Sequence, residues 1–229
     1  SELLDAVGRG AIQLPDFQRD WVWDDIHIRS LIASISLAYP IGAIMLLETG
    51  GNGIRLKPRL VQGVTVPDDT EPTSLILDGQ QRLTSLYLAL GTVEAVQTRS
   101  EKGVDIQRYY YLDIAKCLDP TEDRIDAVVS VPPNRKLTVD FGREVVLDIS
   151  TPEKEYEQRL LPLSVLYDEN EYQDWRREHQ QRNLDDRERY REFDQFEREV
   201  VRAFTNYKVP TIVLPRETPK EAVCQVFER

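Results

Sequence analysis

A compact polar group, Asp78-Gly79-Gln80-Gln81-Arg82, stands between two apolar patterns of the chain. The apolar run over residues 75–77 is typical of a buried strand, and a glycine directly after it permits a sharp change of backbone direction. Apolar residues with helical spacing then follow at Leu83, Leu86, Tyr87 and Leu90. The sequence therefore predicts a strand, a tight turn and a helix, with the polar group in the turn and first helical turn.

A helix N-terminus of this kind could bind an anion. Its first backbone N–H groups lack acceptors within the helix, and the helix dipole adds partial positive charge there. Arg82 could donate two parallel charge-assisted hydrogen bonds to a phosphate. In the alternative interpretation, Asp78 only caps the helix and its polar neighbours are solvated. The local pattern by itself does not choose between the two.

A second group of candidate residues lies in the segment Phe17-Gln18-Arg19-Asp20-Trp21-Val22-Trp23. Aromatic rings beside an arginine can stack on a base or a nucleotide. Aromatic side chains also build hydrophobic cores, and we expect that use for Trp23. The pattern leaves the roles of Gln18 and Arg19 open.

The elements that must position these residues mix strands and helices, so we predict an α/β fold. Helices are expected over residues 1–10, 25–38, 153–166, 169–204 and 218–229. Strands are expected over residues 41–47, 55–66, 75–77, 108–115, 127–131, 141–149 and 208–214. The charged stretch 169–204 carries both signs interspersed, which is typical of a solvated helical face.

Composition bounds the class of protein. A chain of 229 residues suits one domain, or one domain with a large appendage. With 41% hydrophobic and 30% charged residues, it can bury a core and stay soluble. The sequence has neither a run of about 20 apolar residues nor a signal-peptide pattern, so we expect a cytoplasmic protein without membrane contact. Cys117 and Cys224 are far apart, which indicates neither a disulfide framework nor a zinc site.

The formal net charge of -11 argues against binding nucleic acid over the whole surface, because phosphate contacts need clustered Lys and Arg. Any DNA contact would be local or carried by another part of the protein. The helix expected after the capping box at residues 218–221 begins shortly before Arg229, as in a fragment of a longer chain.

Several catalytic signatures are absent. The only histidines are His27 and His179, without the paired arrangement that an HNH-type nuclease needs. The sequence contains no GxSxG elbow, no Walker A motif and no convincing PD-(D/E)xK set. An enzyme site would therefore be built from the candidates already named: Gln18, Arg19, Asp78, Gln80, Gln81 and Arg82.

Four stretches together resemble a known family. In order and spacing, residues 17–23, 39–47, 77–86 and 226–229 are similar to the GmrS-like N-terminal domain of GmrSD and SspE-type restriction proteins. The resemblance covers nearly the whole chain, and DGQQR followed by Leu-Thr is its most specific motif. The family pattern continues with an asparagine after Phe-Glu-Arg, where this sequence ends.

The resemblance implies a ParB/sulfiredoxin-like mixed-sheet core with a helical insertion. Residues 1–151 would form the α/β core, residues 152–207 a charged helical segment, and residues 208–229 a returning strand and the start of a truncated helix. It also implies a prokaryotic defence protein that hydrolyses a nucleoside triphosphate, with GTP expected and Mg²⁺ as cofactor, to drive attack on modified phage DNA.

The same resemblance suggests roles for individual residues. Asp78, Gln80, Gln81 and Arg82 would be catalytic, with Asp78 binding Mg²⁺ or orienting a water, Gln80 or Gln81 positioning that water, and Arg82 holding phosphate. Nucleotide contacts would come from Gly79, Gln18, Arg19, Thr84, Phe227, Glu228 and Arg229. Modified DNA would be sensed by Phe17, Gln18 and Arg19.

DNA cleavage would need an HNH-type nuclease domain or subunit as partner, and the sequence leaves a homo-oligomer open. Two alternatives belong to other classes. The chain could be a non-catalytic module that senses DNA or a nucleotide. It could also be a ParB-like nuclease, which the sequence favours less.

Overall fold

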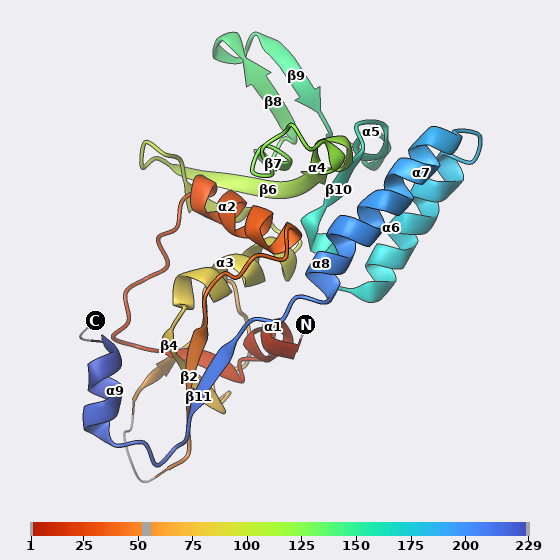
Figure 1. Cartoon of the computed structure of the whole chain (residues 1–229). Coiled ribbons are helices and arrows are strands. Elements are labelled where there is room, and N and C mark those ends of the chain that lie inside the picture. The colour runs from red at the N-terminus through yellow and green to blue at the C-terminus, as the bar shows by residue number, and fades with distance from the viewer. Residues whose placement is uncertain (1, 52–55, 228–229) are drawn as a thin grey trace. The chain divides into compact units, whose positions relative to one another are not determined.

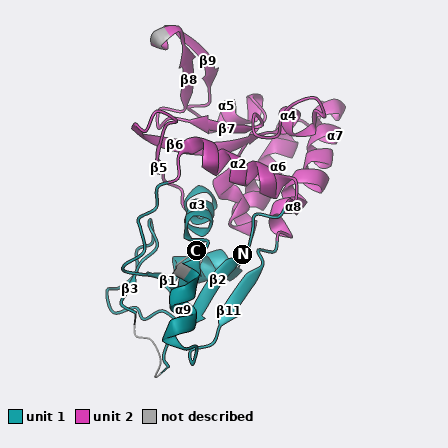
Figure 2. Cartoon of the chain, turned by 60° about the vertical axis from the view of Figure 1, so that its left-hand side comes forward, with its two compact units in different colours: residues 1–22, 40–91, 208–229 teal, residues 23–39, 92–207 magenta. Residues whose placement is uncertain are grey.

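The computed structural model describes residues 2–51 and 56–227 and confirms an α/β fold (Figure 1). The chain forms two compact units (Figure 2). Unit 1 contains residues 1–22, 40–91 and 208–229. Unit 2 contains residues 23–39 and 92–207.

Unit 1 is built on a five-stranded mixed sheet in the order β11-β2-β4-β1-β3. The strands are β1 (Ile12–Pro15), β2 (Ile44–Glu48), β3 (Pro58–Arg59), β4 (Ser74–Asp78) and β11 (Thr211–Leu214). The central strand β4 runs parallel to β1 and antiparallel to β2. Its residues 75–77 are buried, as the apolar run predicts. A central strand buried on both faces is the most rigid place on which to build a site.

Three helices belong to unit 1: α1 (Glu2–Gly8), α3 (Gln80–Leu90) and α9 (Lys220–Phe227). In α3, every residue from Leu83 to Leu90 is buried, so this helix is enclosed on all sides by the protein. Helix α9 lies beside β4, where Val223 packs with Leu47 and Leu77. The sequence prediction of a strand, a tight turn and a helix around residue 79 is thus confirmed.

Unit 2 combines a four-stranded antiparallel sheet with a projecting hairpin and several helices. The sheet holds β5 (Val96–Arg99), β6 (Asp105–Asp113), β7 (Val128–Val131) and β10 (Leu160–Pro162), with β6 pairing all three others. Strands β8 (Lys136–Val139) and β9 (Glu144–Asp148) form the hairpin. Helix α2 (Asp25–Ser36) is capped by Asp24, which accepts from the His27 backbone N–H.

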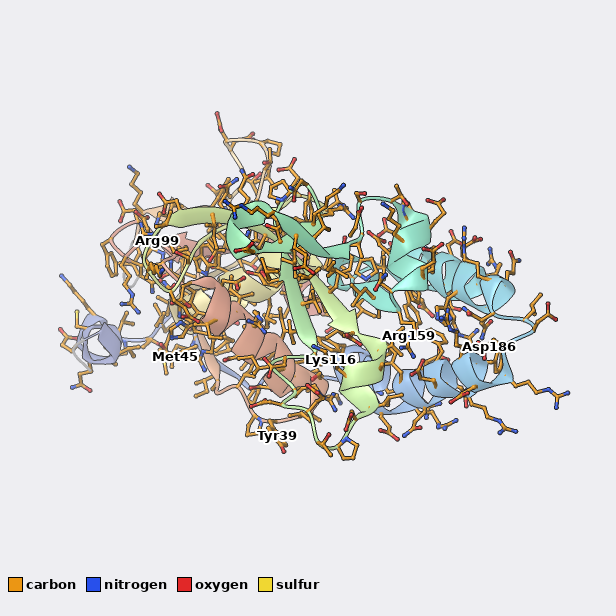
Figure 3. All side chains as sticks on the ribbon, turned by 90° about the horizontal axis from the view of Figure 1, so that it is seen from above. Tyr39, Met45, Arg99, Lys116, Arg159 and Asp186 are labelled. Carbon is orange, nitrogen blue, oxygen red and sulfur yellow. The ribbon has the colours of Figure 1, made fainter. Side chains whose placement is uncertain are left out.

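The helical part of unit 2 comes from segments between and after the strands of its sheet. It contains α4 (Ile114–Leu118), α5 (Pro152–Glu157), α6 (Glu169–Arg182), α7 (Arg187–Phe196), a π-helical turn (Glu197–Val201) and α8 (Arg202–Thr205). Helices α6 and α7 lie side by side, with Asp186 at the end where they join (Figure 3). Asp186 caps α7 by accepting from the backbone N–H groups of Glu188 and Arg189. Between the helices, Trp175, His179 and Phe193 form a buried aromatic cluster.

Some sequence predictions of elements differ from the structure. The helix expected over residues 153–166 ends at Glu157; β10 follows, and residues 163–166 form a 3₁₀ turn. The helix stops after its C-cap Gln158 because Arg159 takes the left-handed backbone conformation, with φ 56°. The strand expected over residues 55–66 shortens to β3, although residue 55 lies outside the described residues. Strand β5 was not expected, because one of its two inward-facing residues, Thr98, is polar.

The predicted domain boundaries at residues 151 and 207 stay predictions. The second of them coincides with the passage of the chain from unit 2 to unit 1 between residues 207 and 208. Among the described residues, no helix is long and apolar enough to cross a membrane.

The buried histidine of the aromatic cluster predicts an acid-sensitive stability. Burial, with a smaller contribution from the Arg189 guanidinium, lowers the pKa of His179 to about 4. Since the unfolded chain protonates this histidine near pH 6.5, the cluster loses stability as the pH falls from about 6.5 towards 4. At pH 5, this linkage costs about 2 kcal/mol relative to neutral pH.

His179→Phe should therefore lose less stability between pH 7.5 and pH 5 than the parent chain, by about 2 kcal/mol in urea unfolding. Phe196→Leu is the matched control: it perturbs the same buried cluster but adds and removes no titrating group. An equal pH dependence of parent and His179→Phe would refute this reading of the cluster.

Candidate functional site

The candidate site lies at the turn between β4 and α3. Gly79 occupies the N-cap position of α3 with φ 87° and ψ 10°, in the left-handed region. A Cβ at this position would overlap Ile44 Cδ1 and lie 3.3 Å from Arg82 Nη2. Backbone conformation and space therefore both select glycine.

The first helical bond of α3 runs from the Leu83 N–H to the Gly79 carbonyl at 3.0 Å. The N–H groups of Gln80, Gln81 and Arg82 precede it and have no acceptor within the helix. The N-cap residue of α3 is Gly79 and not Asp78, and no side chain caps this end of the helix. The interpretation of Asp78 as a simple helix cap is therefore wrong.

Arg82 is held in a narrow slot between two glycines. Its Nη1 donates to the Ile41 carbonyl at 2.7 Å, and its Nη2 lies 3.4 Å from Asp78 Oδ2. Gly42, with φ 87°, passes so close that a Cβ there would overlap Nη1. The guanidinium side chain is 22% exposed and the Asp78 side chain 64% exposed. A shielded cation thus lies beside a solvent-facing carboxylate.

The two glutamines of the motif are buried and hydrogen-bonded to the segment before Trp23. Gln80 Nε2 donates to the Arg19 carbonyl at 2.9 Å. Gln81 Nε2 donates to the Asp20 carbonyl at 3.1 Å, while its Oε1 accepts from the Val22 N–H at 2.9 Å. Since Gln80 is 7% and Gln81 8% exposed, the idea that they are solvated is also wrong.

The aromatic segment is bound to β4 and α3 in return. Gln18 Nε2 donates to the carbonyls of Ile76 and Leu77, at 2.7 and 3.0 Å. The Trp21 indole N–H donates to Ser85 Oγ at 2.9 Å. Arg59 Nη2 reaches the carbonyls of Gln18 and Arg19, at 2.9 and 3.1 Å. The structure therefore brings the two sequence-predicted groups together on unit 1.

The aromatic segment presents exposed side chains to solvent. Phe17 is 55% exposed, a large value for an aromatic ring, and Arg19 is exposed as well. Gln18 Oε1 is buried without a hydrogen-bond partner. Buried unpaired oxygens are uncommon in folded proteins. Of the three residues predicted to sense modified DNA, Phe17 and Arg19 are therefore exposed, while Gln18 anchors the segment to β4.

The remaining predicted site residues are placed less directly. Thr84 is fully buried within α3, and its hydroxyl has no hydrogen-bond partner. Phe227 is the last residue of α9, which packs on β4, but its side chain lies outside what the structure describes. Glu228 and Arg229 also lie outside the described residues. The predicted nucleotide contacts of these four residues stay predictions.

Sequence reasoning missed two parts of the site. Gly42 lies in the Tyr-Pro-Ile-Gly stretch that the resemblance includes, but nothing in the pattern assigned it to the Arg82 slot. Arg59 gave no signal, because a single arginine in a patchy strand has no distinctive spacing. Both contacts join residues about 40 positions apart in the chain, which only the fold can bring together.

The slot predicts an unusual cost for enlarging Gly42. Gly42→Ala should destabilise the protein by about 1–2 kcal/mol through its positive φ, and by a further 1–3 kcal/mol because the new methyl displaces the guanidinium. Gly50→Ala is the matched control, since Gly50 has φ 83° and nothing within 4 Å of an added Cβ. Urea unfolding of both variants measures the difference, and equal losses would rule out a tight slot.

Comparison with known proteins gives the context of this site. The sequence model of the family described as "GmrSD restriction endonuclease, N-terminal domain" matches residues 1–229. The uncharacterized protein MJ0686 of Methanocaldococcus jannaschii is 31% identical over 244 residues. That alignment covers 99% of this chain and 38% of the relative, so the chain spans well under half the length of that protein. With the family match extending over its whole length, this chain belongs to the GmrSD restriction endonuclease N-terminal domain family.

Proposed function

We propose that this chain is the nucleotide-binding part of a restriction protein and that it binds and hydrolyses a nucleoside triphosphate, GTP first among them, at the β4–α3 turn. The observation that carries the proposal is the arrangement around Arg82. A guanidinium is fixed by the Ile41 carbonyl between two glycines, at a helix N-terminus, beside an exposed carboxylate. Fixed donors at a helix N-terminus are well suited to phosphate.

The hydrogen bonds of Arg82 suggest how phosphate would be held. Because Nη1 donates to Ile41, the Nε and Nη2 edge of the guanidinium remains for a bidentate contact. Nη2 has Asp78 Oδ2 as a neighbour at 3.4 Å, at the long end of hydrogen-bond distances. A phosphate oxygen would compete well with that contact. Arg82 would then stabilise negative charge as it develops on the transferring phosphoryl group.

Asp78 also fits the Mg²⁺ that triphosphate hydrolysis commonly uses. Magnesium sites at nucleotides often take one or two carboxylates from the protein and the remaining oxygens from phosphates and water. Among residues 2–51 and 56–227 no cluster of three or more His, Cys, Asp or Glu side chains could hold a metal ion, and we propose Asp78 as the carboxylate that the ion would use. When bound, the ion would neutralise phosphate charge.

Gln80 and Gln81 are better suited to positioning than to orienting the attacking water. Both amides are buried, and three of their hydrogen bonds go to the backbone of residues 19–22. They would hold the aromatic segment against the turn, with Phe17 and Arg19 facing outward to meet modified DNA. This would place a base-stacking ring and a cation next to the nucleotide site. Cleavage would fall to an HNH-type nuclease domain or subunit.

The engaged glutamines also favour a second candidate, a sensor that binds nucleotide without turnover. With both amides in structural hydrogen bonds, no side chain of the motif other than Asp78 is well exposed to orient a water. The two candidates differ in one observable, the release of phosphate from bound nucleotide.

Phosphate release from GTP, ATP and CTP with Mg²⁺ tests the proposal on the chain as it stands. We expect Arg82→Ala to lower the rate by about 10²–10³-fold, because it removes a charged donor from the developing phosphoryl charge. Asp78→Asn should lower turnover while leaving the fold intact, since its carboxylate is mostly exposed. Arg99→Ala, which breaks a surface ion pair with Asp105, is the control.

Nucleotide binding measured alongside turnover separates the outcomes. Binding with turnover that depends on Arg82 supports hydrolysis at this turn. Binding without turnover supports the sensor. Turnover that persists in both Arg82→Ala and Asp78→Asn would place hydrolysis elsewhere and overturn the proposal.

A further inference from the structure

The DGQQR motif is hydrogen-bonded to residues next to two of the points where the chain passes between the two units. The chain passes between the units after residues 22, 39, 91 and 207. The first two passages bracket residues 23–39, the segment that contains α2 and belongs to unit 2. This segment is therefore joined to unit 1 by one stretch of chain at each end. Both stretches are hydrogen-bonded to side chains of the DGQQR motif.

Gln81 holds the first stretch. Val22 is the last residue of unit 1 before the passage, and its N–H donates to Gln81 Oε1 at 2.9 Å. The same amide donates to the Asp20 carbonyl at 3.1 Å. A buried amide that both accepts and donates fixes the backbone of residues 20–22 in one register.

Arg82, the next residue in α3, holds the second stretch. Ile41 is the second residue of unit 1 after the passage, and its carbonyl accepts from Arg82 Nη1 at 2.7 Å. The following residue, Gly42, closes over the guanidinium. Gln81 and Arg82, which are consecutive in the motif, thus hydrogen-bond to the two backbone stretches that join the α2 segment to unit 1.

We infer that Gln81 and Arg82 are positioning residues that fix the two backbone stretches of unit 1 adjoining the α2 segment, so that nucleotide bound at Arg82 stabilises residues 20–22 and 40–44 together. The second half of this inference rests on the proposed function. A phosphate on the free edge of the guanidinium holds Arg82 in its slot and opposes local opening of the stretches that depend on it. By linkage, constraint on these stretches then favours nucleotide binding.

Hydrogen exchange of single amides, read by NMR on the full chain without nucleotide, tests the first half. Gln81→Met removes both hydrogen bonds at similar size, and we expect the Val22 amide to exchange roughly fivefold faster or more. Gln81→Glu, as a carboxylate, keeps an acceptor oxygen for the Val22 N–H but has no N–H for the Asp20 carbonyl, so the Val22 amide should stay better protected than in Gln81→Met. This split separates a specific hydrogen bond from general loosening of the fold.

The corresponding test for the second stretch uses Arg82→Met, with Arg99→Met as the control arginine in an exposed ion pair. Exchange over residues 40–44 should rise in Arg82→Met alone. Unchanged Val22 exchange in Gln81→Met, or equal losses in Gln81→Met and Gln81→Glu, would overturn the positioning role of Gln81. Unchanged exchange over residues 40–44 in Arg82→Met would overturn that of Arg82.

GTP with Mg²⁺ tests the second half, with binding followed by calorimetry in parallel. Slower exchange at Val22 and over residues 41–44 is the expected result, and Gln81→Met should bind GTP without gaining protection at Val22. Binding that leaves these amides unchanged would overturn the coupling. Absence of binding would instead overturn the proposed function, and the nucleotide-free variants would still decide the positioning roles.

Discussion

The contact on which the site depends is the hydrogen bond from Arg82 to the Ile41 carbonyl, made within a slot walled by Gly42 and Gly79. A long, flexible arginine side chain normally loses much rotamer freedom when it is fixed. Here Gly42 and Gly79, both in the left-handed region, reduce the space available to the guanidinium, and the Ile41 carbonyl accepts a hydrogen bond from its Nη1. The price is two positions that accept only glycine. The result is a cation whose direction is set before any ligand arrives.

The surroundings of this contact form a continuous network of side chain to backbone hydrogen bonds. Gln18 donates into β4, while Gln80 and Gln81 bond the backbone of residues 19–22. Residues 17–22 of the aromatic segment belong to no strand, so the amide side chains of Gln18, Gln80 and Gln81 hold them in place. A segment held by a few side chain to backbone bonds can open locally, which makes it a suitable place for a response to a ligand.

Family membership and geometry contribute different parts of the functional conclusion. The family match over the whole chain places it in the GmrSD restriction endonuclease N-terminal domain family. The geometry supports a phosphate site at Asp78 and Arg82 and gives Gln80 and Gln81 a structural use. Nucleotide hydrolysis, Mg²⁺ binding and recognition of modified DNA are proposals that these observations motivate. The mixed sheet of unit 1 agrees with the α/β prediction, while the ParB-like assignment stays a prediction.

The sequence by itself determined the strand, turn and helix around Gly79, because apolar spacing and a glycine act over a few neighbouring residues. It also singled out the two polar groups that the structure brings together. Only the tertiary structure decided what each side chain does. Gln80 and Gln81 are buried and hydrogen-bonded to residues 19–22, and Arg82 is fixed by Ile41. Contacts between residues 40 to 60 positions apart leave no local pattern in a single sequence.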